Sequence, residues 1–193
     1  MRKRNSPVVK ANTFTPRAIK QKFPGPVRDI GVISDTHGLL RPEVPPALSG
    51  VDLIIHTGDI GKPEVIAGLQ KIAPVYCVRG NNDRAAWARH LPDILCLTVS
   101  GIQLYVIHVL QDLRCDPAAA GFRAVISGHS HRPALTSRNG VLYINPGSAG
   151  PRRFTLPVAL ARLRVTCGGN LVPKLIDVFT GKEQSFDFNS RPR

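Results

Sequence analysis

Five polar clusters mark this sequence, and each lies at or just after the end of a short apolar segment that is typical of a β-strand. The first, Asp35-Thr-His37, places a carboxylate and an imidazole two residues apart. Side chains two residues apart on a strand point to the same side, so both can enter one coordination sphere. The other four clusters are His56-Thr-Gly-Asp59, Gly80-Asn81-Asn82-Asp83, His108 and Gly128-His129-Ser130-His131. Together they predict a metal site.

The apolar segments of the first half predict alternating strands and helices. Strand-like runs at 29–34, 51–56 and 74–78 are short and rich in β-branched residues. Between the last two, the stretch 63–72 carries apolar residues at helical spacing. This order is typical of βαβ winding around a buried parallel sheet.

The second half has more signals for antiparallel strands. Ser100-Gly101 and Asn139-Gly140 are tight-turn sequences of the kind that join neighbouring antiparallel strands. The strand-like segments of this half are 93–99, 102–109, 123–127, 141–144, 158–165 and 171–179. Two sheets with helices outside them are the simplest packing of all these elements, which predicts an α/β fold class.

Length and charge predict one domain with a basic extension. A chain of 193 residues that is 42% hydrophobic can bury a full core. The net charge is +13, but residues 1–28 hold eight Lys or Arg and no acidic residue, which leaves 18 basic against 13 acidic residues in the remainder. We predict a disordered basic extension at 1–28, a domain at 29–180 and a loose tail at 181–193.

Several classes of protein are disfavoured. No apolar run is long enough for a secretory signal near the N-terminus or for a membrane span. The four cysteines have no Cys-x-x-Cys spacing, so a zinc knuckle or redox motif is not expected. They are interpreted as reduced and mostly packed thiols of a cytoplasmic protein. A homo-oligomer is compatible with the sequence.

The ordered clusters resemble the pattern of the calcineurin-like metallophosphoesterases: Asp-x-His, Gly-Asp, Gly-Asn-His-Asp/Glu, a lone His, then Gly-His-x-His. The resemblance covers roughly residues 29–180. Together with the late Asn145-Pro146-Gly147-Ser148, it is strongest to the small bacterial and archaeal phosphodiesterase branch. It implies a four-layer α/β/β/α sandwich of two mixed β-sheets flanked by helices.

Imidazole, carboxylate and amide oxygen together suit divalent metals of intermediate hardness, and the lack of thiolates disfavours structural zinc. We expect two ions, with manganese first and iron, nickel, cobalt or zinc as alternatives. By resemblance, Asp35, His37 and His131 hold one ion, Asn81, His108 and His129 hold the other, and Asp59 bridges them. Because Val109 stands where the family usually has Gly, a buried strand histidine is the alternative for His108.

Asn82 is the main departure from the family pattern, because many members carry at this position the His that protonates the leaving group. An Asn has no such proton to give, although it can hydrogen-bond a phosphate oxygen. Asp83 is expected either to orient the site from behind the ligands or to cap the segment after it. Asn81 and His129 are expected to stabilise charge on phosphorus.

Four further residues leave alternatives open. His56 is interpreted as a structural neighbour of the site rather than a ligand, and His90 as a surface residue. Arg152 and Arg153 follow the Asn145–Ser148 turn, so either could clamp a substrate phosphate or lie on the solvated surface.

The sequence thus predicts a metal-dependent phosphodiesterase acting on a small phosphoester. One alternative is a nuclease or nucleic-acid-associated esterase that uses the basic extension. Another is a non-catalytic scaffold of the same fold.

Overall fold

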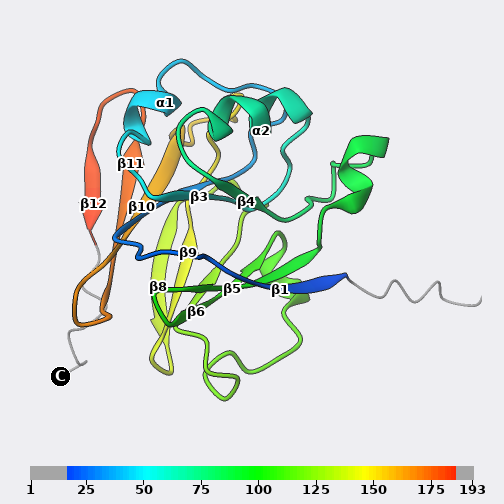
Figure 1. The fold of residues 1–193 in the computed structure, drawn as a ribbon. Helices are drawn as coiled ribbons and strands as arrows, with labels where there is room; N and C mark the ends of the chain where they lie inside the picture. The colour runs from blue at the N-terminus through cyan, green and yellow to red at the C-terminus, as the bar shows by residue number, and fades with distance from the viewer. Residues whose placement is uncertain (1–16, 186–193) are drawn as a thin grey trace, which may run out of the picture.

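Two six-stranded β-sheets pack face to face in the computed structural model, which describes residues 17–185 (Figure 1). The first sheet has the order β1 (Ala18–Lys22), β5 (Ile94–Val99), β6 (Ile102–Ile107), β7 (Ala124–Ile126), β9 (Val141–Asn145) and β8 (Ala134–Arg138). The second has the order β12 (Glu183–Ser185), β11 (Leu171–Asp177), β10 (Ala159–Val165), β2 (Asp29–Ile33), β3 (Leu53–His56) and β4 (Val75–Cys77). The predicted α/β class with two mixed sheets is confirmed.

The parallel part of the second sheet comes from the βαβ winding expected of the first half. Strands β2, β3 and β4 pair in parallel, and helix α2 (Pro63–Gln70) connects β3 to β4. Pro63 suits the first helical turn because its missing N–H has no partner there in any case. Val65 and Leu69, four residues apart, bury one face of the helix.

Apolar side chains fill three layers. The main core lies between the sheets and includes Ile30, Leu53, Leu97 and Leu104. A second cluster packs α1 (Val44–Ala47) and α2 on the outer face of the second sheet, the face that both helices cover in Figure 1. On the outer face of the first sheet, a third cluster includes Tyr105, Phe122 and Val125. The half-buried Leu110, in the 3₁₀ turn η2 (Leu110–Asp112), packs against this third cluster.

Both predicted tight turns adopt the backbone that their sequences favour. Ser100 and Gly101 have φ of 48° and 80°, and Asn139 and Gly140 have φ of 50° and 73°. Two successive positive φ values are the mark of a type I′ turn, whose twist matches that of the strands it joins. These turns set the register of the β5–β6 and β8–β9 hairpins.

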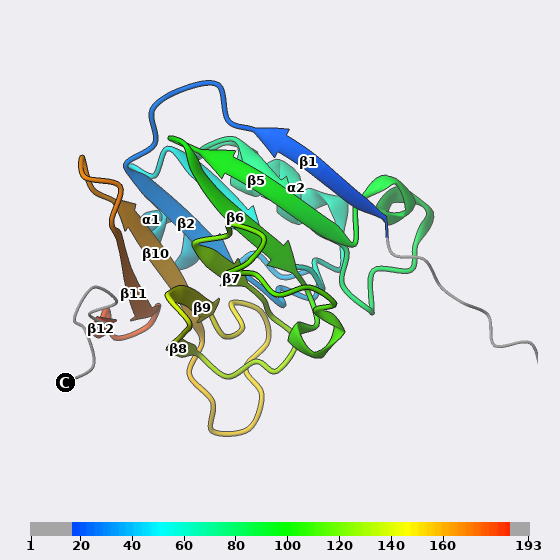
Figure 2. The same ribbon diagram turned by 90° about the horizontal axis from the view of Figure 1, so that it is seen from below.

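Strand β1 corrects the predicted N-terminal boundary. We expected residues 1–28 to be disordered, but Ala18–Lys22 pair in parallel with β5 along the edge of the first sheet (Figure 2). Val27, which follows this strand, is 3% exposed and belongs to the main core. The remainder of that predicted extension, residues 1–16, lies outside the described residues.

Two other expectations need adjustment. Strand β12 pairs with β11, so the predicted tail from residue 181 contributes a short strand before residues 186–193, which lie outside the described residues. Of the four cysteines, Cys77 and Cys96 are half-buried, whereas Cys115 and Cys167 are exposed, so only two are packed thiols.

Within residues 17–185, no helix has the length and apolarity needed to cross a membrane.

The packing of Val27 gives the first prediction. Val27→Ala should lower the free energy of unfolding by about 1–3 kcal/mol, because it removes methyl groups from a filled core. Lys22→Ala, an exposed substitution on the same segment, should change it by no more than about 0.5 kcal/mol. Urea unfolding of both variants tests this, and equal small effects would mean that the segment does not pack on the domain.

Candidate metal centre

The five polar clusters meet where strands of both sheets end. Asp35 and His37 follow β2, and Asp59 follows β3, its parallel neighbour. From the first sheet, His108 follows β6 and His129 follows β7, which are also parallel to each other. Carboxyl ends of parallel strands face the same way, so loops far apart in sequence are brought together.

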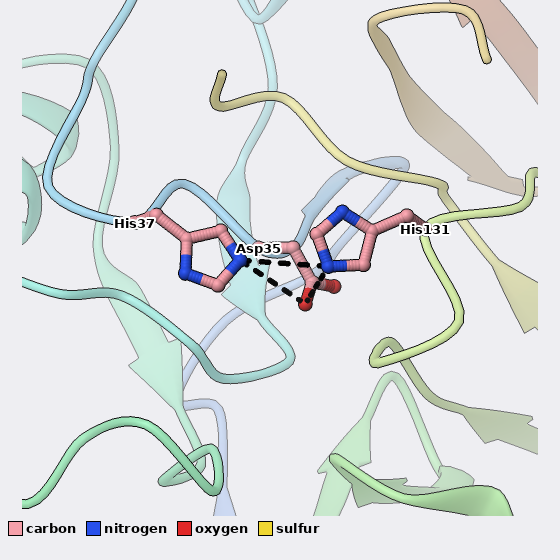
Figure 3. Close-up of side chains that lie close together, drawn as sticks. All are labelled: Asp35, His37 and His131. Carbon is pink, nitrogen blue, oxygen red and sulfur yellow. Dashed lines mark hydrogen bonds and ion pairs between the residues drawn. The ribbon is translucent and has the colours of Figure 1, made fainter. Parts of the chain in front are cut away.

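Asp35, His37 and His131 form the first group of donor atoms (Figure 3). The His131 Nε2 lies 3.2 Å from the Asp35 Oδ1, and the His37 Nε2 lies 3.9 Å from the same oxygen. The two Nε2 atoms are 3.4 Å apart, and the rings stack with their centroids 5.2 Å apart. Three potential ligand atoms therefore converge on one small volume.

A second group forms around the amide oxygen of Asn81. Its Oδ1 lies 3.1 Å from the His108 Nε2 and 3.0 Å from the His129 Nδ1. The same His108 Nε2 lies 3.5 Å from the Asp59 Oδ1. The other oxygen of Asp59, Oδ2, lies 3.9 Å from the His37 Nε2 of the first group. Asp59 thus presents one oxygen to each group.

Asp35 carries a buried oxygen that lacks a hydrogen-bond partner. Its Oδ2 accepts hydrogen bonds from the Ser34 hydroxyl and the His129 backbone N–H, but its fully buried Oδ1 has no such partner. An unpaired buried carboxylate oxygen is costly, and a cation among these donors would satisfy it. The donor set therefore fits a divalent metal.

The backbone at the site is held in a conformation that ordinary residues rarely adopt. Five residues of the two groups have positive φ, between 46° and 68°. They are Asp35, His37, Asp59, His129 and His131. A left-handed backbone at a non-glycine residue costs free energy and tends to cluster where function requires it. The surrounding sheets hold these turns in place.

Two glycines let the loops of the site approach closely. A Cβ on Gly80 would overlap the backbone N of Asp59, and a Cβ on Gly128 would overlap the Ser34 hydroxyl. Any larger residue at either position would move a loop that carries donor atoms.

The tautomer of His108 and the lowered pKa of His131 favour metal binding, whereas the raised pKa of His108 favours its protonated form. The His108 Nδ1 lies 2.7 Å from the Thr57 carbonyl oxygen, so this nitrogen carries the proton and leaves Nε2 facing Asp59. Burial would lower the pKa of His108, but its contacts with Asp59 and Asp35 raise it overall. Burial, aided by the charge of Arg153, lowers the pKa of His131, which favours the neutral, metal-binding form. His108 is buried at the strand end, and its Nε2 faces Asp59 and Asn81.

Asp83 connects the loops from behind the donor atoms. Its carboxylate accepts hydrogen bonds from the backbone N–H groups of Ile60, Gly61 and Gly80, at 3.1, 2.8 and 2.9 Å. The short 3₁₀ helix η1 (Ala86–His90) has Ala85 as its N-cap and no side-chain cap. The contacts therefore correspond to the orienting alternative for Asp83 rather than to the capping one.

Asn82 binds the shared carboxylate directly. Its side-chain amide donates to the Asp59 Oδ2 at 2.6 Å, and its backbone N–H donates to Oδ1 at 2.8 Å. Burial would raise the pKa of Asp59, but hydrogen bonds from His108 and Asn82 lower it below its ordinary value. Asp59 is therefore an anion at neutral pH.

Arg153 reaches the site, and the Asn145–Ser148 turn lies against it. The Arg153 Nη2 is 3.4 Å from the His37 Nε2. The Asn145 amide donates to the Gly128 carbonyl at 2.7 Å, and the Ser148 hydroxyl donates to the Asp35 carbonyl at 2.9 Å.

The sequence motifs did not single out Ser34, whose hydroxyl donates to the Asp35 carboxylate. Its only signal in the sequence is that it adjoins Asp35.

His56 is a structural neighbour of the site. Its Nδ1 accepts the Gly58 N–H at 3.2 Å, so its proton lies on Nε2, which is 2.9 Å from the Thr36 hydroxyl. That hydroxyl donates in turn to the Ile60 carbonyl at 3.0 Å. Burial lowers the pKa of His56 from 6.5 to about 3. The ring stays neutral because protonating Nδ1 would break the bond from Gly58.

A family comparison places the chain. Residues 29–167 match the calcineurin-like phosphoesterase superfamily domain, and these residues carry all seven side chains of the two donor groups. The chain belongs to this superfamily. The predicted resemblance is confirmed.

Relatives and solved structures agree with this assignment. A probable metallophosphoesterase of Methanocaldococcus jannaschii is 39% identical over 162 residues, which cover 77% of this chain and 81% of that protein. The structure of Vacuolar Protein Sorting 29 from Cryptosporidium parvum has a TM-score of 0.69 at 20% identity, covering 84% of this chain and 97% of the other. The phosphoesterase YfcE from E. coli has a TM-score of 0.64 at 20% identity, covering 83% and 100%. The two solved structures share the metallophosphoesterase fold.

The neutral His56 gives a pH prediction for the metallophosphoesterase domain. The unfolded imidazole binds a proton below its ordinary pKa, whereas the folded one does so only near pH 3. The contribution of neutral His56 to the free energy of unfolding is therefore fully present above pH 6.5, and it is lost as the pH falls from 6.5 toward 3. Between pH 7.5 and 5.0 the parent should lose about 2 kcal/mol more than His56→Gln, measured by urea unfolding in EDTA.

The matched control is His90→Gln, because His90 is exposed and lies outside the site. This variant should follow the parent at both pH values. If His56→Gln also followed the parent, the neutral buried imidazole would not be the source of the acid sensitivity.

Proposed function

We propose that the protein is a metal-dependent phosphodiesterase that binds two divalent cations, most favourably manganese. The observation that supports this most directly is the shared carboxylate of Asp59, which presents one oxygen to each donor group. Asp35, His37 and His131 would hold one cation, and Asn81, His108 and His129 the other. Imidazole-rich donor sets favour manganese over the smaller and harder magnesium.

Bound cations would supply Lewis acidity toward a phosphoryl oxygen and toward a water molecule. The chain itself would position the substrate. Arg153 lies close enough to His37 to donate two hydrogen bonds to a phosphate at this edge of the site. Asn81 and His129 would face the charge that develops on phosphorus. Together these groups would bind and orient the phosphate.

Asn82 limits the range of good substrates. Its amide is committed to Asp59 and has no acidic proton to give to a leaving group. Substrates whose leaving group departs as a stable anion should therefore react best, and aryl diesters are of this kind. Alkyl monoesters need general-acid help, which is worth about 10²–10⁴-fold and has no donor at this position.

A scaffold of the same fold is the less favoured alternative. A protein that only binds partners needs no convergent set of donor atoms. Here seven side chains lie close together, and a buried oxygen of Asp35 has no hydrogen-bond partner. The nuclease alternative is tested by including short oligonucleotides in the substrate screen.

A metal-reconstituted substrate screen tests the proposed function. Protein stripped with EDTA should be inactive on bis(4-nitrophenyl) phosphate, and manganese should restore hydrolysis more than magnesium does. Aryl diesters should be hydrolysed faster than alkyl monoesters. Equal or better rates with magnesium would contradict the proposed ligand set, and no hydrolysis with any divalent metal would favour the scaffold.

Asp59→Asn should be the most damaging single substitution, because it weakens the binding of both cations. We expect a loss of metal content by elemental analysis and a fall in kcat/KM of about 10²-fold or more. Glu64→Gln, which changes an exposed carboxylate on α2 outside the two donor groups, is the control. Near-normal metal content in Asp59→Asn would refute the bridging role.

A further inference from the structure

A cavity of about 560 Å³ opens beside the second donor group. Asn81 and His108 form part of its wall, so a substrate bound at the candidate metal centre would have this space next to its phosphate. Cavities of about 300–1,000 Å³ accommodate small-molecule ligands. The cavity is thus large enough for a nucleotide-sized group.

Four arginines and three aspartates line this cavity, and the aspartates are engaged elsewhere. Asp93 forms a 2.6 Å ion pair with Arg79. The Asp83 carboxylate accepts three backbone hydrogen bonds, and Asp112 lies 3.6 Å from the exposed Arg114. The carboxylates therefore do not neutralise the other two arginines.

Arg84 and Arg89 are those other two arginines. The Arg84 Nε donates to the Asn81 carbonyl at 3.1 Å, and within residues 17–185 no carboxylate pairs with its guanidinium. Arg89, on η1, is exposed and makes no polar contact with any described residue. Two unneutralised guanidinium groups at the edge of one cavity attract an anion, for which a phosphate is well shaped.

Part of the cavity wall is apolar. Ile94 and Ile107 are buried, and Val109 is half-buried beside His108. A ligand that fills this space therefore needs an uncharged body as well as an anionic end. A nucleoside that bears a phosphate has this combination.

We propose that this cavity selects phosphodiesters that carry a second phosphate, which Arg84 and Arg89 bind while the body of the ligand lies on the apolar wall. This inference rests on the proposed function and adds the substrate class. The bounded volume favours a small nucleotide over a nucleic-acid strand. The selectivity also assigns a role to Val109, since the side chain at that position contributes to the apolar wall.

A matched substrate pair tests the proposal. Thymidine 5′-(4-nitrophenyl phosphate) and its 3′-phosphate derivative release the same 4-nitrophenolate and differ only in the second phosphate. The manganese-loaded parent should have a higher kcat/KM for the bisphosphate. In Arg89→Gln, the ratio of the two kcat/KM values should fall about tenfold, as expected for the loss of one charge-assisted hydrogen bond.

Arg123→Gln is the control, because Arg123 is exposed at the other end of β7, away from the site. It should keep the parental ratio. An unchanged ratio in Arg89→Gln, or an equal fall in both arginine variants, would overturn the proposal.

A binding measurement separates this proposal from the proposed function. Thymidine 3′,5′-bisphosphate is titrated into EDTA-treated protein by calorimetry, where no hydrolysis can occur. Its affinity should exceed that of thymidine 5′-phosphate and should weaken in Arg89→Gln. Selective binding without hydrolysis by the metal-loaded protein would refute the esterase but support the anion site. Hydrolysis without selective binding would support the esterase but refute the anion site. An eight-nucleotide oligonucleotide that binds far more tightly than the bisphosphate would overturn the small-substrate class.

Discussion

The shared carboxylate of Asp59 is the contact on which the arrangement of the site depends. It lies buried between loops from both sheets, with one oxygen toward His108 and the other toward His37. Asn82 donates two hydrogen bonds to it. Asp83 accepts hydrogen bonds from the backbone of Ile60, which adjoins Asp59, and of Gly80 on a neighbouring loop. A buried anion must be compensated, so the loops that supply its partners cannot move independently. The carboxylate therefore connects the two sheets at their open edge.

The packed core beneath the site offsets the free-energy cost of its strained loops. Five residues of the donor groups adopt a left-handed backbone, and one buried oxygen of Asp35 lacks a hydrogen-bond partner. Each feature costs free energy, and neither would persist in a loop free to relax. The closely packed side chains between the sheets provide the opposing stabilisation. The geometry that suits a cation thus lowers the folding stability of these loops.

The meeting of the polar clusters could be predicted from the sequence because they occur in short motifs at the ends of parallel strands, which face the same way. The sequence also predicted most central strands, whose apolar runs depend little on context. Strands β1, β8 and β12 were missed because they lie at sheet edges and are mostly polar and exposed. The pairing of β1 depends on a partner far along the chain. The left-handed turns, the pairing of Asn82 with Asp59 and the reach of Arg153 are likewise products of tertiary packing, which no local pattern encodes.

Strand β1 also has a consequence for how the protein is made. Ala18 pairs with Ile94, and the β5 strand that it needs ends at Val99. During synthesis, β1 must therefore wait for more than a third of the 193 residues before its partner emerges. Long-range parallel pairing of this kind forms slowly.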